Sequence, residues 1–410
     1  MSSQYKHFNG APKCPGRLLT RRDFIKSAAI STVAIPLNQL HALHNTQLTQ
    51  EKIPKSSLTT IGLCKRYEFA AVHRILAKQF EDLDVRQIVK NQHVTIKVNL
   101  VNSSQENVCG VPLGMTVTVH PVVAMALGNL LVDFGAKHVV FCDQLPFRPL
   151  NEEGFIGYGF KLPDFKRAMK NRVSFVNTRN RGKYSTYAWV KTPGAELANA
   201  WEVNRAYVDT DVLISLAKLK SHVSGGISAG MKNLFGIPPS SLYGDDLDKQ
   251  PDESATGYRN AVMHNCTRQP FTSAGSFNGK SVEGDHGFNV PRFIVDLNSA
   301  FPISLTVIDG ISIIQTAEGW WNGSMVSITR PGLLIAGLNP VSTDAVAASI
   351  MGFDPDAPDR SWPFVNGTNY LALARRKGMG ENRINKLEIA GVDLEAARFE
   401  CQPTYRRKAF

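Results

Sequence analysis

Residues 212–222 read VLISLAKLKSH, and this stretch decides the fold class. Its first part, 212–216, is a continuous apolar run with β-branched residues, which predicts a strand buried on both of its faces. Strands of this kind are typical of parallel sheets covered by helices on both sides. The run continues into Lys218, Lys220 and His222, so polar side chains follow directly where the buried strand ends.

The rest of the chain alternates strand-like and helix-like segments. Apolar runs predict further strands at 58–63, 94–100, 139–142, 305–308 and 333–336. Amphipathic or capped segments predict helices at 68–83, 121–134, 291–300 and 343–351. This alternation predicts an α/β fold, a mostly parallel sheet with helices on both faces.

We expect a single α/β domain over residues 58–400, with two insertions. The alternation weakens over 151–204, where Tyr, Gly and Arg are interleaved, and this segment is expected to form a small excursion or subdomain. Residues 238–289 form a long polar insertion rich in Gly, Ser, Asp and Asn. A segment of that length in a compact domain is typical of a lid, a binding loop or disorder, and its composition fits all three.

The N-terminal segment carries a transport signal. Residues 20–26 read TRRDFIK, which matches the twin-arginine export motif, and an apolar stretch follows at 28–37. That stretch is too short to cross about 30 Å of hydrocarbon as a helix. We therefore expect a twin-arginine signal peptide over 1–44, followed by a linker at 45–57. The predicted location is periplasmic or otherwise exported. The twin-arginine translocation machinery is the predicted partner, and the chain meets the membrane only transiently, through the signal.

The positive charge of the chain is concentrated in this signal. The formal net charge is +11, and residues 1–44 contain six basic residues and one acidic residue. The remaining surplus is spread along the chain without a long basic run, which is typical of a solvated surface. Because no nucleic-acid-binding motif accompanies it, we do not expect a nucleic-acid partner.

The cysteines do not indicate a metal cluster. The six cysteines are scattered, without a Cys-x-x-Cys or ferredoxin-like run, so an iron–sulphur cluster is not expected. Cys64 and Cys142 lie in apolar runs and are predicted to be buried thiols. In an oxidising compartment the five cysteines that follow the signal would permit up to two disulfides, with one cysteine left over.

Polar residues recur where the predicted strands end. Lys97 and Asn99 end one strand, Asp143 ends another, and Asp309 ends a third. The segment 339–344 follows the strand at 333–336. Because ligands of open parallel sheets bind outside the carboxyl ends of the strands, we expect these residues to share one site with those after 212–216.

The lysines of this set point to an anion. Lys97, Lys218, Lys220 and Lys232 are four cations that could converge on a phosphate or a carboxylate. Asn99 and Asn233 are expected to assist in substrate binding. Glycines 225, 226 and 230, close before Lys232, would permit close backbone approach to a ligand. The P-loop spacing is absent, so this is not a nucleotide P-loop.

A divalent metal is the alternative use of the same edge. Asp143, Glu318 and Asp344 are the candidate ligands, with His222 and Asp309 nearby in the predicted arrangement. Mixed imidazole and carboxylate ligands suit zinc, iron or manganese. No local His-Glu-x-x-His spacing supports this set, so it depends on convergence in space.

The ordered motifs resemble the domain-of-unknown-function 362 family over about Val94 to Pro355. The resemblance rests on KLKSH at 218–222, MKNLFG at 231–236, KVN at 97–99, Gly135-Ala136 with Asp143, DGI at 309–311 with Glu318-Gly319, and AGLNPVSTDAVA at 336–347. Some members of that family also carry iron–sulphur ferredoxin modules, for which this chain lacks the cysteines. Asn339 stands where the family often has Asp.

Two functions fit these residues. The first is an enzyme acting on a small anionic substrate, with His222, Lys220 and Asp309 as catalytic groups. The second is a ligand- or metal-binding maturation protein that serves an exported redox partner. The enzyme is favoured, because lysine, histidine and carboxylates at one edge exceed what simple binding requires.

Overall fold

A computed structural model describes residues 56–101, 106–145, 148–179, 187–244, 260–270, 272–274, 276–281, 286–316, 318–319 and 326–402. The predicted signal and most of the predicted linker, 45–57, lie outside these residues. Within them, eight strands form one sheet in the order β16-β1-β15-β12-β9-β2-β5-β6. Their bounds are β1 Thr59–Leu63, β2 His93–Val98, β5 His138–Asp143, β6 Val173–Asn177, β9 Val212–Lys218, β12 Leu305–Gly310, β15 Leu333–Gly337 and β16 Ile389–Gly391.

The sheet is mostly parallel, as the sequence predicts. Strands β12, β9, β2, β5 and β6 are parallel neighbours, while β15 runs antiparallel to both β12 and β1. The reversal of β15 corrects the expectation that 339–344 reaches the same edge as the other strand ends. Only the short hairpin β13 (Ile313–Gln315) and β14 (Ser327–Thr329) is described between β12 and β15. Because β15 pairs with β12 in the antiparallel sense, from Gly310 opposite Leu333 to Thr306 opposite Gly337, it starts at the edge where β12 ends and runs back.

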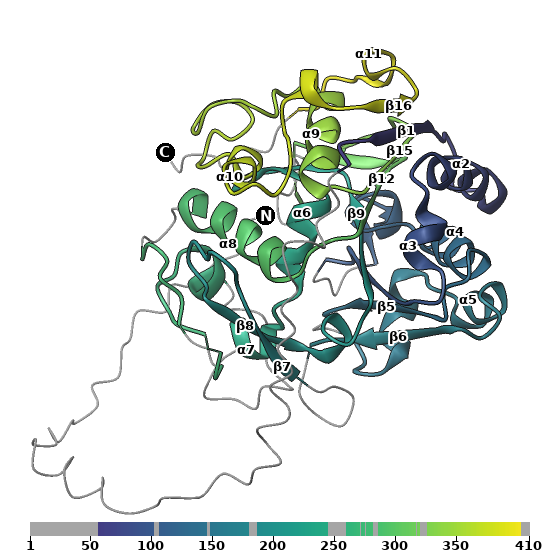
Figure 1. The fold of residues 1–410 in the computed structure, drawn as a ribbon, viewed down its shortest axis with the longest axis horizontal. Coiled ribbons are helices and arrows are strands. Elements are labelled where there is room, and N and C mark those ends of the chain that lie inside the picture. Colours follow the sequence, from purple (N-terminus) through teal and green to yellow (C-terminus); the bar gives the residue numbers. More distant parts are fainter. Residues whose placement is uncertain are drawn as a thin grey trace, which may run out of the picture. The chain divides into compact units, whose positions relative to one another are not determined.

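Helices cover both faces of the sheet (Figure 1). On one side lie α2 (Phe69–Asp82), α3 (Val85–Val89), α4 (Pro121–Asp133) and α5 (Leu162–Ala168). On the other lie α6 (Gly230–Asn233), α8 (His286–Ala300), α9 (Pro340–Ile350) and α10 (Tyr370–Arg376). Strand β9 serves both cores, because Ile214 and Leu216 pack in one apolar cluster and Leu213 and Ala217 in the other. This is the two-sided burial that its apolar run predicts.

Two helices begin where proline chemistry favours a start. Helix α4 has Pro121 in its first turn, and the imidazole Nδ1 of His120 accepts the backbone N–H of Val122 at 3.2 Å. His120 is therefore the N-cap. Helix α9 begins at Pro340, earlier than predicted, because the side chain of Asn339 accepts the N–H groups of the first turn.

Helix α8 begins at His286, five residues before the predicted start at Pro291. A proline inside a helix leaves the carbonyl four residues earlier without its N–H partner. Here that carbonyl belongs to Gly287, and it accepts the backbone N–H of Thr368 at 3.1 Å instead. The replaced hydrogen bond explains how the helix extends backward through the proline.

The weak pattern at 151–204 contains an edge strand of the main sheet. Strand β6 pairs in parallel with β5, from Val139 opposite Val173 to Asp143 opposite Asn177. The other described residues of this segment include α5 and a separate hairpin of β7 (Tyr187–Lys191) and β8 (Ala200–Asn204). Of the polar insertion, the described part includes α7 (Ser240–Tyr243) and a short helical turn at Asn260–His264. No helix of the described residues is long and apolar enough to cross a membrane.

Candidate functional site at the carboxyl edge of the sheet

A loop at 113–119, just before α4, covers the carboxyl ends of the central strands. Its backbone carbonyl groups accept from two lysines, Lys218 Nζ to the oxygen of Gly114 at 2.8 Å and Lys220 Nζ to that of Val117 at 3.0 Å. The loop is fixed to β2 because the backbone N–H of Val119 donates to the oxygen of Asn99 at 2.9 Å. The predicted convergence of strand ends therefore occurs beneath one loop.

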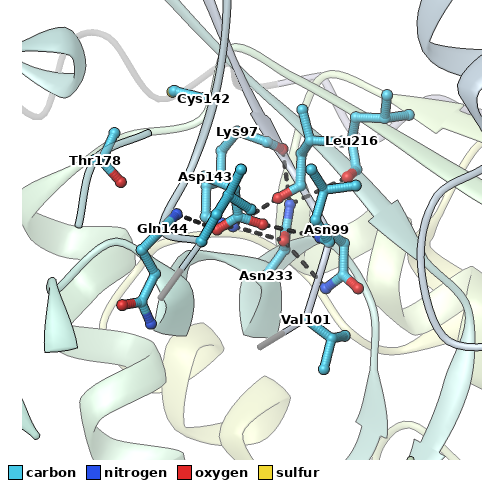
Figure 2. A network of polar contacts seen from close by, with 12 residues as sticks. Lys97, Asn99, Val101, Cys142, Asp143, Gln144, Thr178, Leu216 and Asn233 are labelled. Carbon is cyan, nitrogen blue, oxygen red and sulfur yellow. Dashed lines mark hydrogen bonds and ion pairs between the residues drawn. The ribbon is translucent and has the colours of Figure 1, made fainter. Parts of the chain in front are cut away.

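Lys97 and Asp143 form a buried ion pair at the ends of β2 and β5 (Figure 2). Lys97 Nζ lies 2.8 Å from Asp143 Oδ1, and both side chains are buried. Asp143 also accepts the backbone N–H groups of Leu100 and Gln144, each at 2.8 Å. Burial raises the pKa of Asp143, while Lys97 and these N–H groups act against the rise. The pair is neutral as a unit and satisfied by its own contacts.

Asn233, in α6, holds this pair to the neighbouring strands (Figure 2). Its amide nitrogen donates to the backbone oxygens of Lys97 and Leu216, and its Oδ1 accepts from Lys97 Nζ at 3.3 Å and from Asn99 Nδ2 at 3.2 Å. With its polar atoms engaged inside the protein, Asn233 acts as a positioning residue. Asn99 keeps a buried Oδ1 that has no hydrogen-bond partner among the described residues.

A second buried pair, Lys218 with Asp309, lies at the ends of β9 and β12. The distance from Lys218 Nζ to Asp309 Oδ2 is 3.0 Å, and both side chains are fully buried. Tyr67 donates its hydroxyl to Asp309 Oδ1 at 3.0 Å, and Lys218 donates to the same hydroxyl oxygen at 2.9 Å. Asp309 also accepts the backbone N–H groups of His120 and Ile311. Asp309 is therefore fully engaged in holding Lys218, not free to act as a base.

Tyr67 and His120 were not among the sequence candidates for this site. Their rings stack with centroids 3.9 Å apart. Burial lowers the pKa of His120 to about 4, and burial with the Asp309 charge raises the pKa of Tyr67. Both side chains are therefore uncharged at neutral pH. The position of His120 before Pro121 suggests only a turn or a cap, and Tyr67 lies in a short link without a motif.

Lys220 differs from the two paired lysines. It is 3% exposed, and within the described part of the chain no carboxylate oxygen lies within the 4 Å that defines an ion pair. Its one hydrogen bond to a described residue goes to the oxygen of Val117. Burial, with the nearby Lys232 charge next in importance, lowers the pKa of Lys220 to about 7. Near neutral pH this amine therefore exists in both charged and uncharged forms.

His222 lies at the turn of a hairpin formed by β10 (Lys220–His222) and β11 (Gly226–Ser228). Its Nδ1 accepts the backbone N–H groups of Ser224 and Gly225, and its Nε2 lies 3.3 Å from Glu318 Oε2. Burial lowers the pKa of His222 well below its usual value, with the Lys232 and Lys220 charges acting in the same direction. The ring is thus a neutral tautomer with its proton on Nε2, directed to Glu318.

Lys232 belongs to α6 and lies partly buried beside this hairpin. Its Nζ lies 4.3 Å from the centre of the Phe235 ring, a cation–π distance. The Phe235 ring also contacts His264, which in turn contacts His286. The polar insertion thus brings histidines to the side of the hairpin, a contact that the sequence did not predict.

The structure does not bring the three predicted metal ligands together. Asp143 is paired with Lys97, and Glu318 lies beside His222. Asp344 lies in α9 over the face of the sheet, where it accepts the backbone N–H groups of Gly230 and Met231. Burial raises its pKa to about 7. Among the described residues, no three His, Cys, Asp or Glu side chains are arranged to hold a metal ion.

The fold and this edge define an α/β protein with two buried lysine–aspartate pairs at the carboxyl ends of a mostly parallel sheet. Beside them lies buried Lys220, which has no carboxylate oxygen within 4 Å among the described residues. The chain belongs to the family described as Domain of unknown function (DUF362), whose model matches residues 94–349. The match runs from β2 to α9 and includes all four lysines of the edge. No curated protein matches the sequence of this chain.

Two solved structures are similar to this chain in arrangement. A Thermotoga maritima protein solved by a structural genomics consortium has 18% identity and a TM-score of 0.32, over 61% of this chain and 52% of that one. The lactate racemase apoprotein from Thermoanaerobacterium thermosaccharolyticum has 13% identity and a TM-score of 0.38, over 74% of this chain and 58% of that one. The chain thus spans between half and three fifths of each of these structures. Likeness at this level does not extend to activity.

Proposed function

We propose that this protein is an enzyme that acts on a small anionic substrate at the edge formed by the loop 113–119 and the hairpin β10–β11. Lys220 and Lys232 bind the anion. His222, Glu318 and Asp309 are positioning residues, since the first two hold the hairpin turn and the third holds Lys218. The proposal includes no metal, because Asp143 and Asp344 are engaged in internal contacts.

The observation that carries this proposal is the contrast among the buried lysines. Lys97 and Lys218 each have an aspartate within 3.0 Å, whereas Lys220 has none among the described residues. Burying an ammonium group without a counterion costs free energy, and a bound anionic ligand would reduce that cost by neutralising the charge. Two buried oxygens of the same edge, Asn99 Oδ1 and Thr118 Oγ1, also lack a hydrogen-bond partner among the described residues. Unpaired polar atoms at one edge are typical of a ligand site.

Anion binding is tested by thermal unfolding with and without phosphate, sulfate or formate. A ligand that binds only the folded protein raises the free energy of unfolding by mass action, by about 2.7 kcal/mol at a hundredfold excess over Kd, and so raises the melting temperature. We expect such a rise in the wild type and its loss in Lys220→Met. Lys137→Met is the matched control, since Lys137 is exposed before the amino end of β5 and should leave the shift intact. An anion effect that survives Lys220→Met would contradict the proposal.

The alternative is a ligand-binding protein that serves an exported redox partner. Both functions bind the anion, so the thermal shift does not separate them. Turnover does: incubation of the protein with small carboxylates, followed by product analysis, should show consumption that depends on Lys220. Binding without consumption would favour the maturation protein.

We also infer export by the twin-arginine machinery to the periplasm or another exterior compartment. The support is the motif at 20–26 and the short apolar stretch after it. These residues lie outside the described part of the chain, so the inference rests on sequence alone.

A further inference from the structure

We propose that Lys220 is an imine-forming amine, and that the substrate is a small carboxylate that also carries an aldehyde or ketone group. This inference rests on the proposed function, because it names the class of anion that the same site takes. It goes beyond anion binding, because Lys220 would form a covalent bond to the substrate and not only a salt bridge or a hydrogen bond.

The geometry separates Lys220 from the lysines that could not play this role. Lys97 donates to Asp143, Asn233 and the oxygen of Val98, so its three N–H groups are occupied. Lys218 donates to Tyr67, Gly114 and Asp309, which occupies its three as well. Lys220 donates to Val117 alone among the described residues. The nitrogen of Lys220 can therefore lose a proton and expose a lone pair without breaking an ion pair.

The charges around Lys220 favour its neutral form. Lys232, Lys218 and Lys97 lie near enough to lower its pKa, and Glu318 is the opposing charge. Burial is the largest cause, and together these effects bring the pKa to about 7. A lysine that is desolvated and placed beside another cation is a recognised form of activated amine nucleophile. Lys232, whose charge lies close to Lys220, is the cation proposed to bind the carboxylate of the substrate while Lys220 reacts.

The proposed step balances without an oxidant or a reductant. The lone pair of the neutral Lys220 Nζ forms a bond to the carbonyl carbon, and the carbonyl oxygen takes up a proton to give a carbinolamine. The C–O bond then breaks, the two amine hydrogens and the oxygen leave as water, and a C=N bond remains. The carboxylate of the same molecule stays ionised, so one cation at Lys232 suffices to bind it.

The experiment traps the imine in the full-length protein with glyoxylate and cyanoborohydride at about pH 7. Intact mass and peptide mapping measure labelling at each lysine. We expect Lys220 to be labelled at least about tenfold faster than exposed Lys137. At pH 7 about half of an amine of pKa near 7 is unprotonated, whereas only about one in 2,500 molecules of an ordinary lysine is. Because both sites are compared within one folded protein, the result does not depend on a variant that folds.

Two further arms identify the cause of the labelling. Formate in excess should slow labelling at Lys220, because it occupies the carboxylate position, and should leave Lys137 unchanged. Lys232→Met should also slow it, since the variant loses the cation that binds the carboxylate. Labelling of Lys220 no faster than that of Lys137 overturns the imine proposal. If the anion-induced thermal shift is then still abolished by Lys220→Met, the proposed anion site stands and only the covalent step fails.

Discussion

Two of the buried lysines at this edge are neutralised by a neighbour and one is not, and this difference has thermodynamic consequences. Lys218 and Asp309 form an ion pair that is fully buried and satisfied by Tyr67 and backbone groups. A buried ion pair of this kind adds little net stability, but removing one partner destabilises the protein, because the other charge stays buried and uncompensated. Lys220, in its protonated form, already carries such a charge in the unliganded protein, without a carboxylate beside it among the described residues. Replacing each lysine with Met should therefore change the free energy of unfolding in opposite directions.

Lys220→Met is expected to stabilise the unliganded protein, and more so at lower pH. The pKa of Lys220 is about 7 in the folded state against 10.5 ordinarily. Below pH 7 both folded and unfolded chains are protonated, so the cost of the buried charge is fully present. As pH rises from 7 toward 10.5 the folded state releases its proton and that cost fades. Urea unfolding should show a gain of the order of a few kcal/mol near pH 6 and a smaller gain near pH 9.

Lys218→Met is the matched substitution for this comparison. It should lower the free energy of unfolding by about 3 to 5 kcal/mol, because Asp309 is left buried and unpaired. If Lys220→Met lowered stability by a similar amount, Lys220 would be a structural ion-pair partner and the site assignment would be wrong.

Among the elements, the short helix α6 depends on a contact with α9, the helix that follows the reversed strand β15. Gly230 starts the helix, and the two oxygens of Asp344 accept the N–H groups of Gly230 and Met231 at 2.7 and 2.9 Å. Tyr370 donates its hydroxyl to the same carboxyl group at 3.2 Å. Asp344 thus fixes the helix that carries Lys232, which is a positioning role and not the metal-binding role expected from the sequence.

Gly230→Ala tests this packing. A Cβ at Gly230 would lie 2.3 Å from Thr306 Cγ2 and 2.9 Å from Asp344 Oδ1, so the helix must shift away from the sheet. We expect a loss of stability of about 1 to 3 kcal/mol, typical of an overpacked core, with weaker anion binding because Lys232 moves with α6. Adding Thr306→Ser removes the closest methyl group and should recover part of both losses. Unchanged stability in Gly230→Ala would show that α6 is not fixed at this point.

The elements also show what sequence patterns can and cannot establish. The continuous apolar run of β9 predicts a strand buried on both faces, and the structure confirms it, because two-sided burial leaves a local signature. The direction of β15 has no such signature, since it depends on whether a helix intervenes after β12. For the same reason the pattern identifies Asp344 as a polar residue but cannot show that it lies over the sheet face. Strand β6 alternates buried and half-buried residues at a sheet edge, and this weaker pattern was hidden in the 151–204 segment.

The sequence predicts which residues gather at the candidate site, but only partly how they pair with one another. Strand-end lysines and aspartates converge because parallel strands bring their carboxyl ends to one edge. Side-chain packing in three dimensions determines which lysine pairs with which aspartate, so no sequence pattern distinguishes Lys218 from Lys220. Tyr67 reaches Asp309 from 242 positions away in the sequence, a contact that no local motif records.

In the described part of the molecule, the polar residues of the candidate site lie at one edge of the sheet, while helices cover its apolar faces. Helices cover both faces of the sheet, so the carboxyl edge is where a ligand could contact side chains held by the strands. The five cysteines that the structure describes are free thiols, four of them buried. The described part of the fold is therefore formed without a disulfide.

The proposed role of the twin-arginine motif in export is tested by changing Arg21 and Arg22 to Lys. The substitution keeps the charge of the signal but removes the two planar guanidinium groups, which lysine does not replace in directional recognition. We expect the full-length precursor to accumulate in the cytoplasm and the exported fraction to fall to background, as followed by fractionation and immunoblotting. Arg17→Lys is the control, because it makes the same chemical change in the same segment outside the pair and should leave export unchanged. Normal export of the double variant would mean that another signal directs the chain, and the periplasmic location inferred here would lose its basis.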